Sequence, residues 1–357
     1  MPAAALMRRS AACASLAVAH ALQARCDRAV RFGVVADVQY CDIDDARNFA
    51  GTEVRFYRGS LDGARRAARG FAEARATGGL DFVAQLGDLV DGQNAGGYGA
   101  LRGEAPRSGA ALGEVLAALD CGVEYHHCVG NHELYNFSPA ELRAGPLGAA
   151  PHVVAKSELY HAFQVQKWTF IVLNPYEESS SLPRDTAGYR AAAALLRARN
   201  PNPVLEAPCD FFAGLAGPEM RFVPFNGGVG AAQRKWLEEE LGRADGPVVV
   251  FSHLPLFHES CSWRNVAWDA PEVLDVLRAS GRVHSVVAGH AHGGGYAQDE
   301  AGIHHVVVEA TLTHPTAYAL CEGRADGSLV VRGVGSVPSR ALAAPPRLAA
   351  ALAGRGG

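Results

Sequence analysis

The sequence lacks the features that mark several common protein classes. No apolar run approaches the roughly 20 residues that span a bilayer, so we predict no membrane span. The formal net charge of −4 offers no general basic surface for nucleic acid, although a local basic patch in a phosphate pocket remains compatible with it. No internal repeat and no Cys-x-x-Cys pair occur. The scattered cysteines favour buried free thiols in a reducing compartment over a disulfide framework or a structural zinc site; they are Cys13, Cys26, Cys41, Cys121, Cys128, Cys209, Cys261 and Cys321.

What is present is the composition of a globular protein, with 48% hydrophobic and 20% charged residues among 357. Residues 1–28 carry Arg8, Arg9, Arg25 and Arg28 against the single acid Asp27. This composition fits an organelle transit peptide, a weak secretory core, or a disordered extension of a cytoplasmic protein. We expect a cytoplasmic location, with a mitochondrion or plastid as the alternative. One domain is predicted over residues 29–340, followed by a disordered Ala/Pro/Gly-rich tail over 341–357.

Five short apolar stretches end in polar residues of the kind that bind ligands. In residues 82–86 a buried strand is predicted, and Gly87 then permits a tight turn that places Asp88 at the strand's carboxyl end. Ligands bind outside the carboxyl ends of strands in open α/β sheets, so these polar side chains are predicted to share one rim. The other stretches are 32–39, 124–133, 248–253 and 286–292.

Apolar residues at helical spacing separate these strands. Leu61, Ala64, Ala68 and Phe71 recur behind Ser60, which is predicted to be the N-cap of a helix over 60–77. The alternation of strand and helix predicts an α/β fold. Residues 175–228 mostly lack periodicity, which is typical of a functional or disordered segment. Further predictions are helices at 110–119, 232–241 and 271–280, a hairpin over 160–174, and strands of a second sheet at 303–311, 317–321 and 328–334.

Taken singly, the polar residues have structural explanations, since Asp37 and Asp88 could cap helices and His253 could be a hydrogen-bonded core histidine. Together, the motifs G-D, G-N-H-E, S-H and G-H-x-H, each after a predicted strand, resemble the calcineurin-like metallophosphoesterase superfamily. The resemblance covers residues 32–292. It implies a four-layer αβ-βα sandwich, in which two facing mixed sheets are flanked by helices, and two divalent metal ions about 3.5–4 Å apart.

The resemblance also implies which residues hold each ion. Where the superfamily usually has Asp-x-His, this chain has Gln39, whose neutral amide oxygen favours Mn²⁺ or Mg²⁺. We therefore expect two divalent ions, Mn²⁺ first, with Mg²⁺ or Zn²⁺ as alternatives. The carboxylate of Asp88 is predicted to span both ions with its two oxygens. One ion would take Asp37, Gln39, Asp88 and His292, and the other Asp88, Asn131, His253 and His290.

Further blocks are similar to one branch of that superfamily, the manganese-dependent ADP-ribose/CDP-alcohol diphosphatases. They include residues 48–52, 91–95, 225–228, 267–268, 289–296 and 335–340. This resemblance implies hydrolysis of the pyrophosphate bond of ADP-ribose, to AMP and ribose 5-phosphate. It also implies cleavage of CDP-alcohols such as CDP-choline and CDP-ethanolamine, to CMP and a phosphoalcohol, by a hydroxide held between the ions.

His132, next to Asn131, is predicted to stabilise or protonate the leaving phosphate oxygen, with a supporting hydrogen bond as the alternative role. The substrate contacts are predicted by residue chemistry, each against the alternative of loop packing. An aromatic face can stack on a base or ribose, an arginine can clamp a phosphate, an amide can bind hydroxyls, and glycines permit close backbone approach. In that order the candidates are Phe49 and Phe225, then Arg58, then Asn94 and Asn136, then Gly227 and Gly228.

Two other function classes stay open at this point. A phosphomonoesterase or cyclic-nucleotide phosphodiesterase could use the same fold, and a non-catalytic scaffold could retain the metal site, although a scaffold would typically have lost ligands. The expected partners are small nucleotide diphosphates, with no nucleic acid and no membrane, and we expect a monomer.

Overall fold

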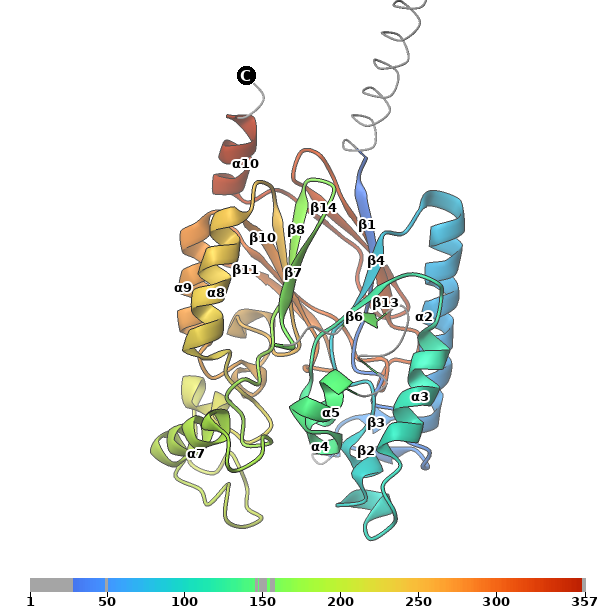
Figure 1. Ribbon diagram of the computed structural model, residues 1–357, viewed down its shortest axis with the longest axis vertical. Helices are drawn as coiled ribbons and strands as arrows, with labels where there is room; N and C mark the ends of the chain where they lie inside the picture. Colours follow the sequence, from blue (N-terminus) through green and yellow to red (C-terminus); the bar gives the residue numbers. More distant parts are fainter. Residues whose placement is uncertain (1–27, 49–50, 145–146, 148–152, 155–157, 355–357) are drawn as a thin grey trace, which may run out of the picture.

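Two mixed β-sheets face each other in the middle of the fold, and helices cover their outer surfaces (Figure 1). This computed structural model describes residues 28–354, apart from 49–50, 145–146, 148–152 and 155–157. The predicted targeting segment, apart from Arg28, and the substrate candidate Phe49 therefore lie outside the described residues. No helix within the described ranges has both the length and the hydropathy that a membrane crossing needs.

The first sheet has the strand order β15-β14-β13-β1-β4-β5-β6. Its strands β1, β4, β5 and β6 pair in parallel, and β13, β14 and β15 extend it in antiparallel pairing beyond β1. Helices α2 and α3 cover its outer face (Figure 1). The elements are β1 (Val30–Val35), α2 (Tyr57–Gly78), β4 (Phe82–Gln85), α3 (Ser108–Leu119), β5 (Tyr125–His127), β6 (Val153–Val154), β13 (Tyr318–Gly323), β14 (Leu329–Val334) and β15 (Arg340–Leu342).

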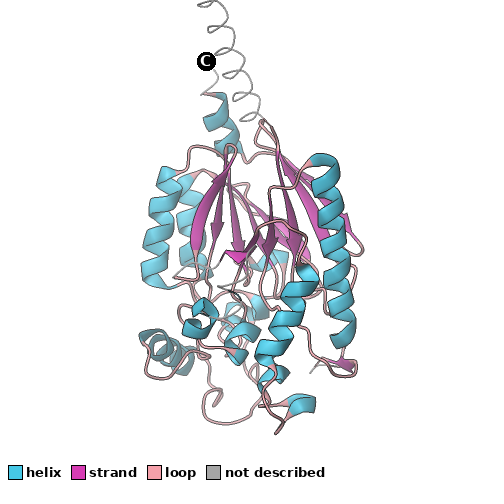
Figure 2. Cartoon of the chain, turned by 45° about the vertical axis from the view of Figure 1, so that its right-hand side comes forward, coloured by secondary structure: helices cyan, strands magenta, loops and turns pink. Residues whose placement is uncertain are grey.

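The second sheet has the order β11-β12-β10-β9-β8-β7, with helices α8 and α9 on its outer face (Figure 2). Its strands β8, β9, β10 and β12 are parallel, and the edge strands β7 and β11 are antiparallel to their neighbours. The expected four-layer α/β sandwich is confirmed. The elements are β7 (His161–Val165), β8 (Trp168–Val172), α8 (Gly230–Arg243), β9 (Val248–Ser252), α9 (Ala270–Ser280), β10 (Val283–Ala288), β11 (Gly295–Gln298) and β12 (His304–Val307).

Phenylalanine side chains from both sheets pack against one another between the two layers. Phe32 of β1 stacks on Phe82 of β4 with the ring centroids 5.1 Å apart. From the second sheet, Phe170 and Phe251 meet the ring of Phe32 edge-on at 5.4 and 5.8 Å. All four side chains are buried, which stabilises the fold by about 1.5–3 kcal/mol each. The sheets are thus held face to face, and the carboxyl ends of their parallel strands open on the same side (Figure 1).

Several expectations from the sequence are wrong in detail. Strands β13 and β14 were expected in the second sheet but belong to the first, where β13 pairs with β1. Alternating burial predicts a strand, but its partner is fixed by long-range pairing. Helix α2 begins at Tyr57, so Ser60 is not its N-cap and its hydroxyl donates to the Tyr57 carbonyl instead.

The segment 175–228 contains a helix, α7 (Ala187–Arg199), capped by Thr186 and burying Ala192, Ala193 and Leu196. Alanine is too weakly apolar to make this pattern visible in the sequence. The tail is not disordered over 341–354, because Leu342 is buried in β15 and a further helix, α10 (Pro346–Ala353), buries Leu348. Shorter elements are the hairpin β2 (Ala46–Arg47) and β3 (Val54–Arg55), with α4 (Asn131–Asn136) and α5 (Pro139–Ala144) after β5.

Candidate metal centre

The predicted metal ligands all follow the carboxyl ends of parallel strands, in loops or, for Asn131, at the first residue of helix α4. The first sheet supplies Asp37 and Gln39 after β1, Asp88 after β4 and Asn131 after β5. The second sheet supplies the histidines, His253 after β9 and the pair His290 and His292 after β10. The facing arrangement of the sheets brings these loops to one rim, as the strand-end argument predicted.

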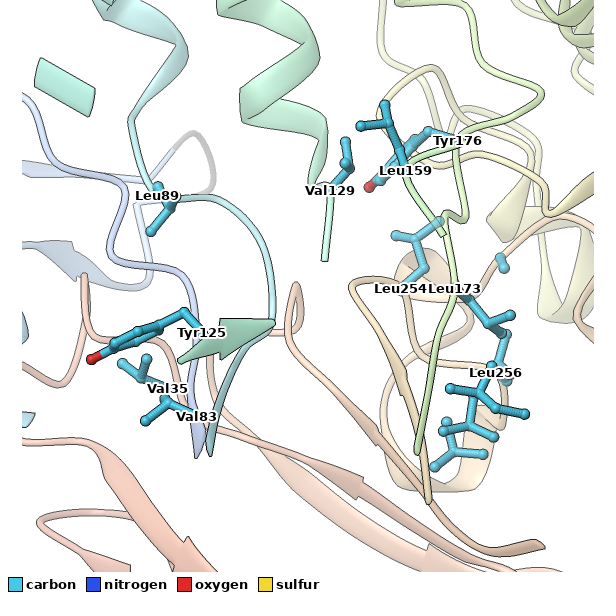
Figure 3. Close-up of a cluster of buried hydrophobic side chains, with 14 of the residues drawn as sticks. Val35, Val83, Leu89, Tyr125, Val129, Leu159, Leu173, Tyr176, Leu254 and Leu256 are labelled. Carbon is cyan, nitrogen blue, oxygen red and sulfur yellow. The ribbon is translucent and has the colours of Figure 1, made fainter. Parts of the chain in front are cut away.

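Buried leucine and valine neighbours anchor the ligand loops. Leu89, Val129 and Leu254 follow the ends of β4, β5 and β9 and are 1%, 3% and 0% exposed. Figure 3 shows them in one apolar cluster with Val35, Val83 and other core side chains. Because each lies one or two residues from a predicted ligand, burial of these side chains fixes the ligand loops.

Short glycine-containing turns let the ligands approach each other. Gly87 has φ 99°, and a Cβ atom there would lie 2.5 Å from Nδ1 of His253. A Cβ at Gly130 would clash with the Asp88 carboxylate, and one at Gly289 would lie 2.5 Å from Oδ2 of Asp37. Each glycine directly precedes a predicted ligand, and nearby ligand atoms leave no room for a side chain at the glycine. This explains why the sequence has the pairs G-D, G-N and G-H.

Backbone strain concentrates at the same place. The ligands Asp37, Gln39, Asp88 and His290 have φ of 49°, 41°, 58° and 64°. Non-glycine residues in this left-handed region cost about 1–3 kcal/mol each, and such strain is typical of functional sites. The loops therefore hold these side chains in a geometry that folding alone would not favour.

One group of ligand atoms surrounds Nε2 of His253. This nitrogen lies 3.1 Å from Nδ1 of His290, 3.3 Å from Oδ1 of Asn131 and 3.4 Å from Oδ2 of Asp88. Asp88, His253 and His290 can each direct one ligand atom to within 4.8 Å of the others. Nitrogen and oxygen donors this close to one another suit a divalent cation.

Hydrogen bonds on the far side of the rings set the histidine tautomers in this group. Nδ1 of His253 donates to the Leu86 carbonyl at 2.7 Å, which leaves Nε2 as the lone-pair donor when the ring is neutral. Nε2 of His290 lies 3.1 Å from Oδ1 of Asn226, which leaves Nδ1 for the group. Asn226 was not among the predicted site residues, although it lies within residues 225–228, one of the blocks that are similar to the diphosphatases.

A second group of ligand atoms surrounds the amide of Gln39. Its Nε2 lies 2.9 Å from Oδ2 of Asp88 and 3.1 Å from Nε2 of His292, and the His292 nitrogen is 3.7 Å from Oδ1 of Asp37. Oδ2 of Asp88 is thus common to both groups. Its Oδ1 accepts the backbone N–H of His132 at 2.9 Å. One oxygen of Asp88 therefore faces both groups, and the use of both oxygens to span two ions stays a prediction.

The Gln39 amide also shows that the residues fit a metal ion. Its Oε1 is buried without a hydrogen-bond partner, and rotation of the amide would place this oxygen among the donors of Asp88 and His292. In the present orientation the N–H groups supply the positive charge that a cation would otherwise supply. A carboxylate pair, an amide oxygen and an imidazole form a donor set suited to Mn²⁺ or Mg²⁺.

The electrostatics of the site indicate a shortage of positive charge. Burial raises the pKa of Asp37, His253 opposes this shift, and the neighbouring Asp88 adds to it. Burial disfavours the charged form of Asp88 as well, but the charges of His253 and His132 hold its pKa below the usual range. Burial, and then the guanidinium charge of Arg55, lower the pKa of His292 to about 3. Asp37 and Asp88 are both buried, and a cation bound by both would offset the cost of burying two negative charges.

Glu133 connects two ligand-bearing segments through hydrogen bonds. Its carboxylate accepts the backbone N–H groups of Asp88, Leu89 and Gly130 at 2.7, 2.5 and 2.8 Å. Burial, and then the charge of Asp88, raise its pKa to about 7. Glu133 is the last residue of the G-N-H-E motif, and no role was predicted for it. Its three hydrogen bonds hold the Asp88 loop and the Gly130 turn in position, so it is a positioning residue.

His132 is 8% exposed and lies beside Asp88. Its Nδ1 accepts the backbone N–H of Gly92 at 2.8 Å, and Oδ2 of Asp91 is 3.4 Å away. Acceptance at Nδ1 places the proton of the neutral ring on Nε2. The ring thus has a fixed orientation and one N–H, at Nε2, available to donate a hydrogen bond.

Three of the predicted substrate residues make other contacts in the structure. Arg58 is exposed and pairs with Asp42 and Asp44. The Asn94 amide donates to the carbonyls of Tyr40 and Asp91, and the Asn136 amide donates to those of Asp91 and His132. These contacts favour the loop-packing alternative, because the side-chain donors are already engaged.

The other predicted substrate residues that the structure describes are Gly227, Gly228 and Phe225. Gly227 packs so closely on Pro175 that a Cβ would clash, and Gly228 pairs with Glu178, so both shape the loop. Phe225 lies 5.8 Å from the His290 ring, with Phe211 and Phe212 at 6.3 and 6.1 Å beyond it. We call Phe211, Phe212 and Phe225 the aromatic edge of the metal centre.

Arg55 was missed by sequence reasoning. It is half-buried at the end of β3, its Nε has no hydrogen-bond partner, and it forms no ion pair within the described residues. The N–H of the next residue, Phe56, donates to the Leu312 carbonyl, and the Leu312 N–H donates to the Asp37 carbonyl, each at 2.9 Å, which places the end of β3 next to the metal centre. A single arginine in a polar loop carries no sequence signal that separates it from Arg58, three residues later.

Comparisons with known proteins agree with this geometry. The family model described as calcineurin-like phosphoesterase matches residues 30–294. The relatives named manganese-dependent ADP-ribose/CDP-alcohol diphosphatase include those of Danio rerio and Homo sapiens. The first is 34% identical over 333 residues, covering 87% of this chain and 97% of its own, and the second is 33% identical over 339 residues, covering 90% and 95%.

Comparison with solved structures also finds similar folds. A crystal structure described as a dimetal phosphatase from Danio rerio has a TM-score of 0.79 at 32% identity and covers 89% of this chain and 100% of its own. GAP50, described as the anchor in the inner membrane complex of Plasmodium, has a TM-score of 0.53 at 12% identity over 90% and 91%. The latter likeness shows the fold alone.

Proposed function

Because the chain belongs to the calcineurin-like phosphoesterases and, within them, to the manganese-dependent ADP-ribose/CDP-alcohol diphosphatases, we propose that it hydrolyses the pyrophosphate bond of ADP-ribose and of CDP-alcohols. The products are AMP with ribose 5-phosphate, or CMP with a phosphoalcohol. The observation that carries the proposal is the position of Oδ2 of Asp88, which is common to two groups of donor atoms.

The residues of the metal centre divide into two ligand sets. Asp37, Gln39, Asp88 and His292 would hold one ion, and Asp88, Asn131, His253 and His290 the other. When bound, the two Mn²⁺ ions lower the pKa of a water molecule and polarise the phosphoryl oxygens. Tyr176 donates to Oδ1 of Asn131 at 3.2 Å, which orients the amide oxygen toward His253.

The protein's own side chains supply the remaining chemistry. With Nδ1 accepting the Gly92 N–H, the Nε2–H of His132 would donate a hydrogen bond to the leaving phosphate oxygen and stabilise the negative charge that develops there. Arg55, a half-buried cation without an ion-pair partner among the described residues, would bind the substrate phosphates in place of the predicted Arg58. Phe225 would stack on the nucleobase, because an aromatic face accepts either adenine or cytosine without reading its edge.

The experiment that tests this function compares substrates side by side in Mn²⁺. ADP-ribose and CDP-choline should be cleaved to AMP and CMP, while a phosphomonoester and a cyclic nucleotide should react at least about tenfold more slowly, which corresponds to about 1.4 kcal/mol in the barrier. Preference for either of the last two would replace the diphosphatase by the alternative enzyme. Absence of turnover with all four would favour the scaffold.

The remaining parts of the proposal concern partners and location. The protein would act as a monomer on small nucleotides, with no nucleic-acid or membrane partner, in the cytoplasm or, with residues 1–28 as a transit peptide, in a mitochondrion or plastid. Light scattering on the purified chain tests the monomer. A fluorescent fusion with and without residues 1–28 tests the location.

A further inference from the structure

The edge of the metal centre next to Arg55 carries exposed apolar side chains. Within the described part of the chain, the large apolar side chains that are exposed are Val54 and Tyr98, at 36% and 40%. Val54 directly precedes Arg55 in β3, so its side chain lies on the opposite face of the strand from Arg55. Tyr98 is therefore the exposed apolar side chain to consider at this edge.

The hydroxyl end of Tyr98 lies close to the catalytic machinery. A Cβ at Gly92 would clash with Oη of Tyr98, and the backbone N–H of the same Gly92 donates to Nδ1 of His132 at 2.8 Å. Burial of this hydroxyl, and then the charge of Asp91, raise the pKa of Tyr98 well above the usual range, while the charge of Arg55 opposes the shift. The hydroxyl is therefore buried beside Asp91 and Arg55, while the exposed fraction of the residue leaves ring surface accessible.

The two edges of the metal centre differ in chemistry. The aromatic edge, Phe211, Phe212 and Phe225, lies beside His290, which belongs to the His253 group. Arg55 lies on the side of the Gln39 group, because the N–H of the next residue, Phe56, donates to the Leu312 carbonyl and the Leu312 N–H donates to the Asp37 carbonyl, each at 2.9 Å. A pyrophosphate that spans both groups therefore has a flat aromatic surface at one end, and a cation and a phenol ring at the other.

We propose that Tyr98, with Arg55, is the specificity-determining site for the half of the substrate that is not the nucleoside, either phosphoribose or phosphoalcohol. The assignment rests on the proposed function. The leaving half needs a cation for its phosphate and a hydrogen-bond donor for its leaving oxygen, and Arg55 and His132 meet these needs at this edge. The ring of Tyr98 offers a π face for the trimethylammonium group of choline or for the C–H face of a sugar.

The loop around Tyr98 fits this role. Gly96 and Gly99 have φ of 74° and 67°, and Gly97 has open space around it. The carbonyl oxygen Oε1 of Gln93 accepts the Ala100 N–H at 2.7 Å, which fixes the end of the loop. The loop is therefore held on both sides of Tyr98, which fixes the ring with its hydroxyl against Gly92.

The test measures two selectivity ratios, each as kcat/KM in Mn²⁺. CDP-choline against CDP-glycerol varies only the alcohol, and ADP-glucose against CDP-glucose varies only the base. Tyr98→Ala should lower the preference for CDP-choline over CDP-glycerol by about two- to fivefold, the value of one exposed cation–π contact, mainly through KM. The base ratio should stay constant. The matched variant Phe225→Ala should raise KM for substrates of both bases and leave the alcohol ratio constant.

Two conservative variants separate recognition from loop packing. Tyr98→Phe keeps the ring and should retain both wild-type ratios, whereas Tyr98→Leu keeps apolar bulk without a π face and should behave like Tyr98→Ala even if the latter fails to fold. A Tyr98→Leu enzyme with the wild-type alcohol ratio, or with a changed base ratio, would overturn the inference. Wild-type enzyme that cleaves none of these nucleotides would instead refute the proposed function.

Discussion

Gln39 donates its side-chain amide to Oδ2 of Asp88 at 2.9 Å, and the amide oxygen on its other side is buried without a partner. The same Nε2 lies 3.1 Å from His292. The amide therefore lies among the donor atoms that would otherwise hold a cation, and rotating it by half a turn converts a hydrogen-bond donor into a metal ligand. This position makes Gln39 the residue whose substitution reports most directly on the first ion.

Gln39→His should lower the Mn²⁺ concentration that gives half-maximal activity and should increase inhibition by Zn²⁺, because imidazole binds both ions more tightly than a neutral amide oxygen. Gln39→Ala should shift the Mn²⁺ requirement upward by about 10–100-fold, the usual cost of disturbing a metal site. Metal-activation curves of the three enzymes provide the measurement. Coincident curves would remove Gln39 from the ligand set.

Asp88→Asn should lose metal and turnover together. Oδ2 faces both ligand groups, so the substitution removes the one negative charge that the two sites share. We expect a loss of metal affinity greater than the about 10–100-fold found for residues that only support a ligand. Metal analysis of the purified variant checks this, and two ions retained per chain would contradict the shared position.

His132→Ala should leave the metal content unchanged and lower kcat by about 10²–10³-fold, the usual cost of removing one hydrogen-bond donor to charge that develops in the transition state. The ring contacts Gly92 through Nδ1, so it is not oriented as a ligand. Loss of metal along with activity would instead assign His132 a structural role.

Arg55→Ala and Arg58→Ala form a matched pair. Arg55 has no ion pair among the described residues, and we expect its removal to lower kcat/KM by about 10–100-fold, which corresponds to about 1.5–3 kcal/mol for a hydrogen bond to a charged group. Arg58 forms exposed pairs with Asp42 and Asp44, and such pairs contribute only about 0–1 kcal/mol. Steady-state kinetics with ADP-ribose distinguish the two, and equal effects would contradict the assignment of the phosphate contact.

We predict that the folded protein loses stability in acid because of the buried residue His284. The residue is fully buried in β10 beside Trp168 and His304, and burial, then the charge of His304, lower its pKa to about 3 from 6.5. Because the folded-state pKa lies below the unfolded value, this contribution to stability is complete above pH 6.5 and is lost as the pH falls toward 3.

His284→Leu should therefore flatten the dependence of unfolding free energy on pH between these values by up to about 1.36 kcal/mol per unit. Urea unfolding of both chains at pH 8 and pH 5 measures the change, and the difference at pH 8 isolates the packing cost of the substitution. Parallel pH profiles for the two chains would show that His284 does not titrate on unfolding.

The metal ligands were predictable because each is defined by its distance from the end of its own strand. Apolar residues 82–86 followed by Gly87 place Asp88 without knowledge of any other part of the chain, and the same holds for Asn131 after Gly130. The substrate contacts were less predictable. Asn94 and Asn136 have the right chemistry, but the carbonyls that engage their amides come from Tyr40, Asp91 and His132.

The sequence by itself determined the α/β class, the ligand types and the rim on which they gather, since these depend on local periodicity and on motifs a few residues long. Only the tertiary structure decided that β13 pairs with β1, that a single oxygen of Asp88 faces both ligand groups, and that Arg55 rather than Arg58 is without a carboxylate partner among the described residues. These features depend on which distant segments meet. Two arginines three residues apart are alike in sequence, and the position of Asp42 and Asp44 separates them.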